Sequence, residues 1–308
     1  MRIVFLGTPE FAVNSLNALV NEFEVVAVVT QPDREKDRKG RIIEGAVSKR
    51  ANELNIPVFK FEKIRRDGVE ILRELAPDLM VTCAYGQMLS QEIIDIAPYG
   101  IFNVHGSLLP KYRGSAPIQR ALINGEETTG ITIMKTDIGM DSGDILAVKE
   151  LPIAHDDYVD ELYAKLSVLG ADLLIETIKG VLAGKVTPIK QNESEVTYAQ
   201  MIKKEDGIID FSLSASEIRN KIRGVGYGVC SHQDQPLKIY KLDLATVQCE
   251  LKAGSVIDAN KKGITVACGN GSAIVITELQ QSGKKRMRVV DFLNGVKIKS
   301  GDEFNGLA

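Results

Sequence analysis

The stretch RIVFLGTPEFAVNSLNALVNEFEVVAVVT, residues 2–30, contains the pattern that decides the fold. Residues 2–7 and 24–30 are short apolar runs rich in β-branched side chains, which favour β-strands. Residues 9–20 between them have apolar side chains at helical spacing. Two apolar strands joined through one helix are typical of a parallel β-α-β unit.

The same alternation continues to about residue 150. Its apolar runs lack a clean polar alternation, which favours a parallel sheet covered by helices on both faces. A closing pair of strands and a long amphipathic helix at 156–184 complete the pattern. The expected strands are 2–7, 24–30, 56–61, 78–85, 100–105, 129–135 and 143–153, and the expected helices are 9–20, 46–55, 67–77, 116–125 and 156–184.

The chain changes character after residue 184. Residues 185–206 lose the apolar period and gain polar side chains, which indicates a linker. After one helical stretch at 214–225, short alternating runs follow one another with glycine-containing turns between them. Such closely spaced strands predict a small barrel or sandwich over 207–308.

Composition points to an ordinary globular protein. Of 308 residues, 44% are hydrophobic and 26% are charged, as in most globular proteins. The net charge of the whole chain is −3, which does not indicate a nucleic-acid-binding protein. The charge is uneven, however, because residues 207–308 carry 14 Lys/Arg against 10 Asp/Glu, while the rest carries 24 against 31. A basic C-terminal part could serve a polyanionic partner, although ordinary variation in surface charge would explain it equally well.

Several classes of protein are excluded by what the sequence lacks. Its four cysteines and three histidines have no metal-ligand spacing, so we expect no metal site and reduced, buried thiols. Met1 leads directly into a strand, and no apolar run reaches membrane-spanning length, so we expect a cytoplasmic protein without membrane contact. The turn at 7–11 lacks the later glycines of a dinucleotide fingerprint, and neither a Walker motif nor a GxSxG elbow occurs.

The stretch NVHGSLLPKYRG, residues 103–114, carries the most specific chemistry. Asn103 and His105 end an expected strand of the parallel sheet, and ligands bind beyond such strand ends. Residues i and i+2 of a strand point to one face, so the two side chains can aim at one spot. An amide donor and an imidazole suit a reaction in which a carbonyl oxygen gains charge. A structural pair that merely ends a strand would look the same.

An imidazole in this role normally has a carboxylate that orients it. The segment KTDIGMDSGDI, residues 135–145, offers Asp137 and Asp141, with Asp144 as a third candidate. Its glycines permit tight turns, so the segment can fold back beside the strand end. Asp and Gly are also ordinary turn residues, and spacing alone does not choose between Asp137 and Asp141, while Asp144 is the less favoured candidate.

These two stretches together resemble the signature region of the 10-formyltetrahydrofolate-dependent formyltransferases. The resemblance lies in N-x-H, then SLLPKYRG, then DIGMDSGD, and it extends to RIVFLGTPEFAV, TQPDR, AYGQML, KKEDGIIDFSLSASEIRNKIRG and DFLNG along nearly the whole chain. The chain is most similar to the members that formylate the methionine of initiator methionyl-tRNA. The resemblance implies an α/β, Rossmann-like formyltransferase domain over 1–184, a linker over 185–206, and a small OB-like β-barrel domain over 207–308 that binds tRNA.

By position, the resemblance makes Asn103, His105 and Asp141 the catalytic residues. It implies 10-formyltetrahydrofolate as the formyl donor and no metal, because the folate already carries the activated carbon. The implied folate-binding residues are Ser107, Leu108, Leu109 and Pro110, together with Tyr85, Gly86, Gln87, Met88 and Leu89 from the end of the expected strand at 78–85.

The loop at 31–45 has nine charged residues among fifteen. In the family, the loop at this place reaches toward the acceptor end of tRNA, and basic side chains can neutralise phosphates there. Here the loop continues as IIEGAVSK, and the C-terminal part has VGYGVCS, both of which depart from the family pattern. The implied tRNA-binding residues are Arg34, Arg38, Lys39 and Arg41, with Arg38 expected to matter most, and Lys284, Lys285 and Arg286.

The expected reaction is therefore transfer of a formyl group to the α-amine of methionine on initiator tRNA, by a monomer. Two alternatives remain open. One is a formyltransferase that acts on a nucleotide-linked amino sugar, which would share the same three motifs. The other is a non-catalytic tRNA- or folate-binding protein on the same scaffold. The long basic loop and the full-length basic C-terminal part favour tRNA over the sugar nucleotide.

Overall fold

The computed structural model describes residues 1–36, 39–247 and 250–306. They form two compact units. Unit 1 comprises Met1–Pro117, Thr128–Ile153 and Glu161–Gln200, and unit 2 comprises Ile118–Glu127, Ala154–Asp160 and Met201–Ala308. Domain limits at 184 and 206 stay a prediction from the sequence.

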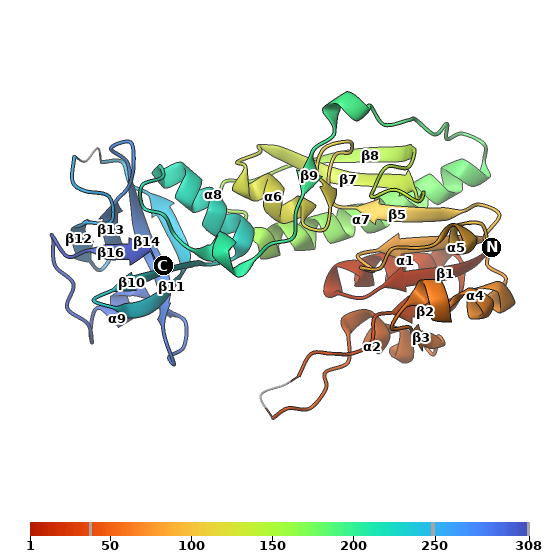
Figure 1. The fold of residues 1–308 in the computed structure, drawn as a ribbon, viewed down its shortest axis with the longest axis horizontal. Helices are drawn as coiled ribbons and strands as arrows, with labels where there is room; N and C mark the ends of the chain where they lie inside the picture. Colours follow the sequence, from red (N-terminus) through yellow and green to blue (C-terminus); the bar gives the residue numbers. More distant parts are fainter. Residues whose placement is uncertain (37–38, 248–249, 307–308) are drawn as a thin grey trace. The chain divides into compact units, whose positions relative to one another are not determined.

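Unit 1 is built on a seven-stranded sheet with the order β3-β2-β1-β4-β5-β7-β8 (Figure 1). The five strands from β3 to β5 are parallel, and β7 and β8 are added in antiparallel orientation. This confirms the predicted α/β fold with a parallel-rich sheet. The strands are β1 (Arg2–Gly7), β2 (Glu24–Thr30), β3 (Val58–Lys60), β4 (Leu79–Cys83), β5 (Ile101–His105), β7 (Thr128–Lys135) and β8 (Ile145–Pro152).

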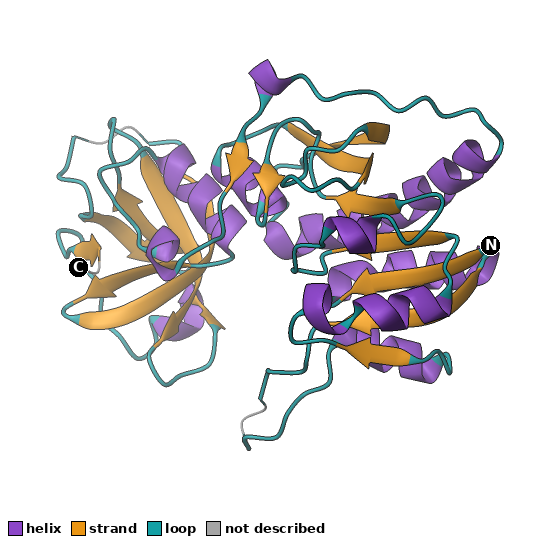
Figure 2. Cartoon of the chain, turned by 45° about the vertical axis from the view of Figure 1, so that its right-hand side comes forward, coloured by secondary structure: helices purple, strands orange, loops and turns teal. Residues whose placement is uncertain are grey.

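Helices cover both faces of this sheet (Figure 2). On one face, α1 (Val13–Glu22) is joined to α7 (Val159–Leu182) by a 3.0 Å hydrogen bond from Asn14 Nδ2 to Ser167 Oγ. On the same face α2 (Ala46–Glu53) packs beside α1. On the other face, the buried apolar side chains of α3 (Ile64–Asp67), α4 (Val69–Leu75) and α5 (Gln91–Ile94) form one cluster with those of β1, β2, β4 and β5. Both faces are therefore apolar, which explains why these strands lack polar alternation.

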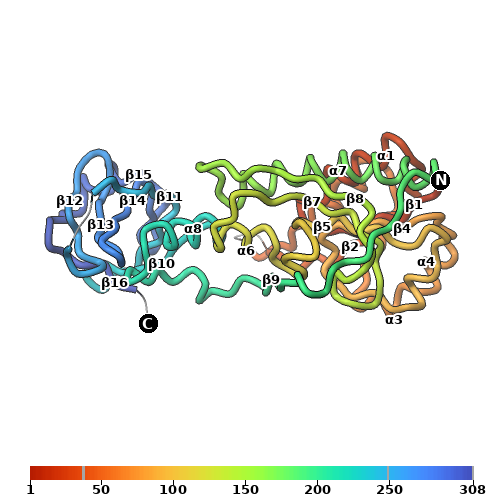
Figure 3. The backbone as a smooth tube through the Cα atoms, turned by 90° about the horizontal axis from the view of Figure 1, so that it is seen from above, coloured from red at the N-terminus to blue at the C-terminus, as the bar shows by residue number. Residues whose placement is uncertain are grey.

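Residues 183–200 run back along unit 1 after the end of α7, as the green part of the tube shows (Figure 3). They contain a 3-10 turn, η2 (Glu193–Glu195), and the short strand β9 (Tyr198–Ala199), which pairs in parallel with β6 (Arg113–Gly114). Ile189 also exchanges two backbone hydrogen bonds with Ile145 of β8. This part of the predicted linker is thus held against unit 1 by backbone pairing. The remaining short elements before β7 are η1 (Glu10–Ala12) and α6 (Pro117–Ile123).

Unit 2 contains an antiparallel sheet with the order β12-β13-β14-β11-β10-β16, and β15 pairs with β14. Its two ends meet, because Val256 N donates to Asp302 O and Phe304 N donates to Gly254 O. The sheet therefore curls into a small barrel, which is one of the two folds that the strand pattern predicted and the one that the resemblance implied. Its strands are β10 (Gly228–His232), β11 (Gln235–Leu244), β12 (Val256–Asn260), β13 (Gly263–Ala267), β14 (Ala273–Gln281), β15 (Met287–Arg288) and β16 (Phe304–Gly306), and its helices are η3 (Lys204–Gly207), α8 (Ala215–Val225) and α9 (Val289–Phe292).

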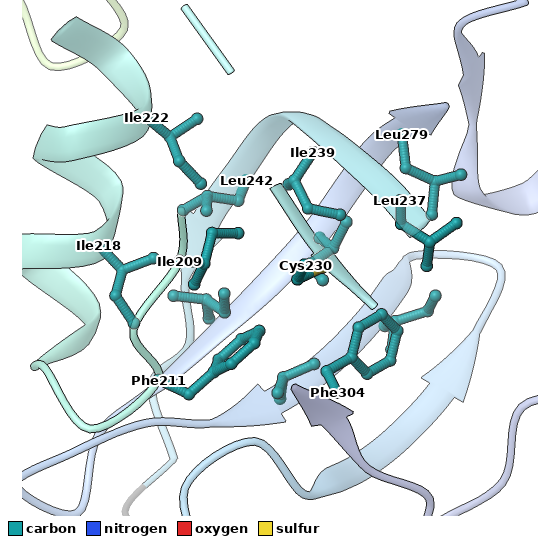
Figure 4. Packing of buried hydrophobic residues seen from close by; sticks show 14 of the residues in the cluster. Ile209, Phe211, Ile218, Ile222, Cys230, Leu237, Ile239, Leu242, Leu279 and Phe304 are labelled. Atoms are coloured by element: carbon teal, nitrogen blue, oxygen red, sulfur yellow. The ribbon is translucent and has the colours of Figure 1, made fainter. Parts of the chain in front are cut away.

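The core of unit 2 lies between the curled sheet and α8 (Figure 4). Ile218 and Ile222 of α8 are each 1% exposed and belong to the same buried cluster as Ile239 of β11 and Phe304 of β16. The N-terminus of α8 is closed by a capping box, in which Ser214 Oγ accepts from Glu217 N while Ser214 N donates to Glu217 Oε2. The cap satisfies backbone donors that would otherwise lack partners at the start of the helix.

We expect the Ser214→Ala variant to lose about 1 kcal/mol of the free energy of unfolding of unit 2, the usual cost of removing a serine N-cap. Urea unfolding followed by circular dichroism would measure the change. Ser282→Ala is a matched control, because Ser282 belongs to the same unit and is exposed in the turn between β14 and β15. Equal stability of the two variants would show that the cap contributes nothing.

Three cysteines in the described part of the chain, Cys83, Cys230 and Cys268, are buried free thiols. Burial raises the pKa of each to about 12, so none is a reactive thiolate near neutral pH. Among the same residues, no three His, Cys, Asp or Glu side chains are grouped as metal ligands. No helix there is long and apolar enough to cross a membrane.

Candidate active site

Asn103 and His105 lie at the C-terminal end of β5, where the sheet changes from parallel to antiparallel pairing. The alternation of side chains along a strand places both on one face. Thr82 of the neighbouring β4 donates from Oγ1 to Asn103 Oδ1 at 3.0 Å. Because this contact uses the amide oxygen, it fixes the orientation of the amide and leaves Asn103 Nδ2 as the donor.

Asp141 lies in the loop between β7 and β8, at residues 136–144, and its carboxylate reaches both side chains at the end of β5. Asp141 Oδ1 is 3.5 Å from Asn103 Nδ2, and Asp141 Oδ2 is 3.7 Å from His105 Nδ1. The two other candidate carboxylates have local partners instead. Asp137 accepts from Gly139 N and Ser142 Oγ within its own loop, and Asp144 lies 3.6 Å from Lys190 Nζ. The structure therefore places Asp141 beside the imidazole.

The two nitrogens of His105 have different partners. Nε2 is 3.0 Å from the carbonyl oxygen of Tyr112, and because a carbonyl can only accept, Nε2 carries a proton. In the neutral ring Nδ1 then holds the lone pair, on the side that faces Asp141. The imidazole is 5% exposed, so its orientation is fixed by burial as well as by this hydrogen bond. Nδ1 is the atom that can take up and return a proton.

Gly114 N completes the environment of the carboxylate by donating to Asp141 Oδ2 at 2.7 Å. A glycine is required at this position for two reasons. Its φ of +121° disfavours any residue with a Cβ, and an added Cβ would lie 2.8 Å from the carbonyl oxygen of Ala199. The glycine that follows Arg113 in the motif thus lets the turn approach both Asp141 and β9.

The turn Ser107–Pro110 is fixed to β7 by a pair of hydrogen bonds. Thr132 Oγ1 donates to Ser107 O at 2.7 Å and accepts from Leu109 N at 3.1 Å. Ser107 and Leu109 are buried, whereas Leu108 and Pro110 are partly exposed. Of the four implied folate positions in this turn, Leu108 and Pro110 are thus the two that keep exposed surface.

The implied folate positions at 85–89 also divide into buried and exposed residues. Leu89 is buried in the core of unit 1, and Gln87 bridges Ile64 N and Phe61 O. Gly86 and Met88 are exposed.

The fifth of these positions, Tyr85, combines burial with an unsatisfied polar atom. It is 4% exposed and burial raises its pKa, yet its hydroxyl has no hydrogen-bond partner among the residues that the structure describes. An unsatisfied buried hydroxyl is costly, and Tyr85 belongs with Leu89 to the buried cluster of unit 1 and not to its exposed surface.

The implied tRNA positions are all on the surface where the structure describes them. Arg34 is paired with Glu62, and Lys39 and Arg41 are exposed, whereas Arg38 lies outside the described residues. In unit 2, Lys284 and Lys285 are exposed in the turn between β14 and β15. Arg286 lies 4.6 Å over the ring of Tyr240 and is ion-paired with Glu278.

Sequence reasoning missed several residues that hold this arrangement together. The hydroxyl of Thr82 and the carbonyl of Tyr112 orient Asn103 and His105, and Gln191 bonds to the Asp141 loop from the predicted linker. The pairing of β4 with β5 would have indicated Thr82, since it lies directly opposite Asn103. Neither a backbone carbonyl nor a lone glutamine in a polar segment gives any signal in the sequence.

Taken together, the site combines one amide donor, one imidazole whose Nδ1 faces a carboxylate, and that carboxylate, which is held by a backbone N–H. An amide donor can stabilise a carbonyl oxygen that becomes negative during attack. The imidazole can take the proton that the attacking group loses, and the carboxylate can stabilise the resulting imidazolium. This is chemistry for moving an acyl group to a protic nucleophile such as an amine.

Comparison with known proteins agrees with this chemistry. The formyl transferase family matches residues 1–178, and the formyl transferase C-terminal domain matches residues 201–297. The methionyl-tRNA formyltransferase of Geotalea uraniireducens is 46% identical over 98% of this chain and 97% of its own, and that of Bacillus subtilis is 44% identical over 98% and 96%. The N-formyltransferase of Helicobacter canadensis, solved with folinic acid and dTDP-3-aminofucose, has the same fold, with a TM-score of 0.66 and 22% identity over 91% of this chain and 98% of its own.

Proposed function

This chain belongs to the formyl transferase family, and we propose that it transfers the formyl group of 10-formyltetrahydrofolate to the α-amine of methionine on initiator methionyl-tRNA. The product is N-formylmethionyl-tRNA, which serves translation initiation, and the reaction takes place in the cytoplasm. The observation that carries this proposal is identity of 42–46% over nearly the full length, C-terminal domain included, to proteins named for this reaction.

Asn103, His105 and Asp141 perform the transfer in this proposal. Asn103 Nδ2 donates to the formyl oxygen as it gains negative charge, while the hydrogen bond from Thr82 keeps the amide turned in the required sense. His105 Nδ1 takes the proton that the α-amine loses on forming the new C–N bond. Asp141 stabilises the charged imidazole, and the same Nδ1 returns the proton to the leaving nitrogen.

The formyl donor supplies the activated carbon, so the residues of this chain need only bind it and orient it. Leu108, Pro110, Gly86 and Met88 offer exposed surface at two neighbouring strand ends of the sheet. Strand ends of this kind are where open α/β sheets bind ligands. The other implied positions, which are Tyr85, Ser107, Leu109, Gln87 and Leu89, act by holding these residues in place. No metal is part of the mechanism.

Initiator tRNA is bound in this proposal by basic residues on both units, and the protein acts as a monomer. Lys284, Lys285 and Arg286 form a basic turn in unit 2, and the loop at 31–45 supplies further positive charge in unit 1. Contacts of this kind are made with phosphates, so they add affinity that falls as salt concentration rises.

We expect joint replacement of Lys284, Lys285 and Arg286 by alanine to raise the KM for methionyl-tRNA by about tenfold or more with little change in kcat. The slope of log KM against the logarithm of the salt concentration should fall by about three, which is about one for each lost phosphate contact. Steady-state formylation at several salt concentrations measures both. The matched control replaces the exposed Lys63, Lys149 and Lys185 by alanine, which removes the same charge. Equal effects of the two variants would mean that net charge, not this turn, governs binding.

The decisive experiment compares two acceptors with one donor. The purified chain is given 10-formyltetrahydrofolate with either charged initiator tRNA or a nucleotide-linked amino sugar, and transfer of labelled formyl groups is measured. We expect formylation of the tRNA only. Formylation of the sugar would support the first alternative, and absence of transfer to either acceptor would support a non-catalytic binding protein.

A further inference from the structure

Three segments of unit 1 contact Asp141, which lies in the loop between β7 and β8. They are the end of β5, the turn at Gly114, and a segment that lies outside both matched family regions. The segment is residues 189–199, which we call the strap, and the family matches cover 1–178 and 201–297. The strap pairs with β8 through Ile189 and with β6 through β9. It therefore spans the distance between the loop that carries Asp141 and the turn that carries Tyr112 and Gly114.

Gln191 of the strap bonds directly to the backbone of the Asp141 loop. Its Nε2 donates to Asp141 O and to Gly143 O, both at 2.8 Å, so each of its two N–H groups has one carbonyl. Its Oε1 accepts from Arg113 Nε at 3.0 Å. Both donors of the amide are used on the loop, and the side chain is partly buried. Gln191 thus ties together two carbonyls on either side of Ser142.

The loop needs such support because Asp141 has an unfavourable backbone conformation. Its φ is +49°, in the left-handed region that residues with a Cβ rarely occupy. Conformations of this kind persist only where surrounding contacts determine them. The two carbonyls held by Gln191 include that of Asp141 itself, so the hydrogen bonds act on the strained peptide.

Arg113 and the rest of the strap hold the opposite side of the site. Arg113 is 3% exposed and pairs with Glu193 of the strap at 2.7 Å. Thr197 accepts from both Tyr112 N and Arg113 N, through its hydroxyl and its carbonyl. The carbonyl of Tyr112 in turn accepts from His105 Nε2. One strap therefore fixes the residues that orient the imidazole and the loop that orients the carboxylate.

We propose that Gln191 is a positioning residue for the formyl transfer, which holds Asp141 within reach of His105 and Asn103. The inference rests on the proposed function. A carboxylate that shifts by about 1 Å can cost up to about 10²-fold in rate, even when the change lies away from the reacting atoms. The hydrogen bonds of Gln191 go to backbone carbonyls and to Arg113, so it acts through Asp141 and needs no contact with either substrate.

We expect the Gln191→Ala variant to lose about 10- to 100-fold in kcat with near-normal KM values for methionyl-tRNA and folate. The isosteric Gln191→Glu variant keeps the acceptor for Arg113 but lacks both N–H donors, so it should lose as much. Gln91→Ala is the matched control, because Gln91 is an exposed glutamine of α5 whose amide donates to the nearby Asp95. A Gln191→Ala variant as active as this control would overturn the proposal.

A double variant separates positioning from a general effect on folding. If Gln191 acts through Asp141, adding Gln191→Ala to Asp141→Asn should lower kcat no further, because residues that act as a unit are not additive. Full additivity of the two losses would overturn the proposal. So would failure of both Gln191 variants to fold, since Gln191 would then be a structural residue.

Hydrogen exchange gives a reading that does not depend on activity. In the folded Gln191→Ala variant, the amides of residues 139–144 should exchange faster than in the wild type, while those of β5 should not change. Unchanged exchange in that loop would contradict the inference and leave the proposed function intact. Conversely, a wild-type chain that does not formylate tRNA would contradict the proposed function and leave the loop measurement unaffected.

Discussion

The His105→Ala variant is expected to lose about 10³-fold in kcat, while its KM for folate stays close to that of the wild type. The estimate follows from the magnitude of general acid-base catalysis, which is about 10²–10⁴-fold. His105 Nε2 faces the carbonyl of Tyr112 and Nδ1 faces Asp141, so alanine removes both the proposed proton acceptor and the cation that the carboxylate would stabilise. Single-turnover formylation with saturating substrates measures the chemical step directly.

A second substitution distinguishes proton transfer from mere support of the turn. His105→Gln can still donate to the carbonyl of Tyr112 but has no ring nitrogen that can take up a proton. It should therefore be as inactive as His105→Ala. His155→Ala serves as the control, since the side chain of His155 is 67% exposed and belongs to unit 2. A His105→Gln variant that retains most of the wild-type rate would remove His105 from proton transfer.

The residues that could be predicted from the sequence are those governed by local periodicity. Alternation along a strand places Asn103 and His105 on one face whatever the rest of the chain does, and apolar runs without polar alternation predict a sheet covered on both sides. The short strands and glycine turns of unit 2 predicted a closely spaced all-β fold in the same way, but left a barrel and a sandwich equally open. In each case the signal lies within about ten consecutive residues.

The contacts that could not be predicted join segments far apart in the chain. Spacing alone did not choose between Asp137 and Asp141, because the choice depends on how the loop folds and on the N–H of Gly114. Gln191 lies 50 residues from Asp141 in a segment with no apolar period, and that segment was therefore predicted to be a linker. A single amide that bonds to two backbone carbonyls leaves no pattern, since carbonyls are present at every residue.

The Asp141→Asn variant is expected to lose about 10²–10³-fold in kcat. The substitution keeps the size and shape of the side chain, so the loss reports on charge and hydrogen bonding. In the wild type, Oδ2 accepts from Gly114 N, and Oδ1 lies 3.5 Å from Asn103 Nδ2. An asparagine has only one oxygen. If that oxygen faces Gly114, the new amide nitrogen faces that of Asn103, and two donors then oppose each other. The substitution also removes the negative charge that stabilises the imidazolium of His105 during transfer.

Asp137→Asn is the appropriate comparison, because Asp137 lies in the same loop and accepts hydrogen bonds from Gly139 N and Ser142 Oγ, which an amide oxygen can replace. It should keep nearly the wild-type rate, so a large difference between the two variants assigns the effect to the carboxylate beside His105 and not to the loop. Measuring kcat for both under the same conditions tests this. Equal losses would mean that loop conformation alone limits the rate, and the charge of Asp141 would then have no part in catalysis.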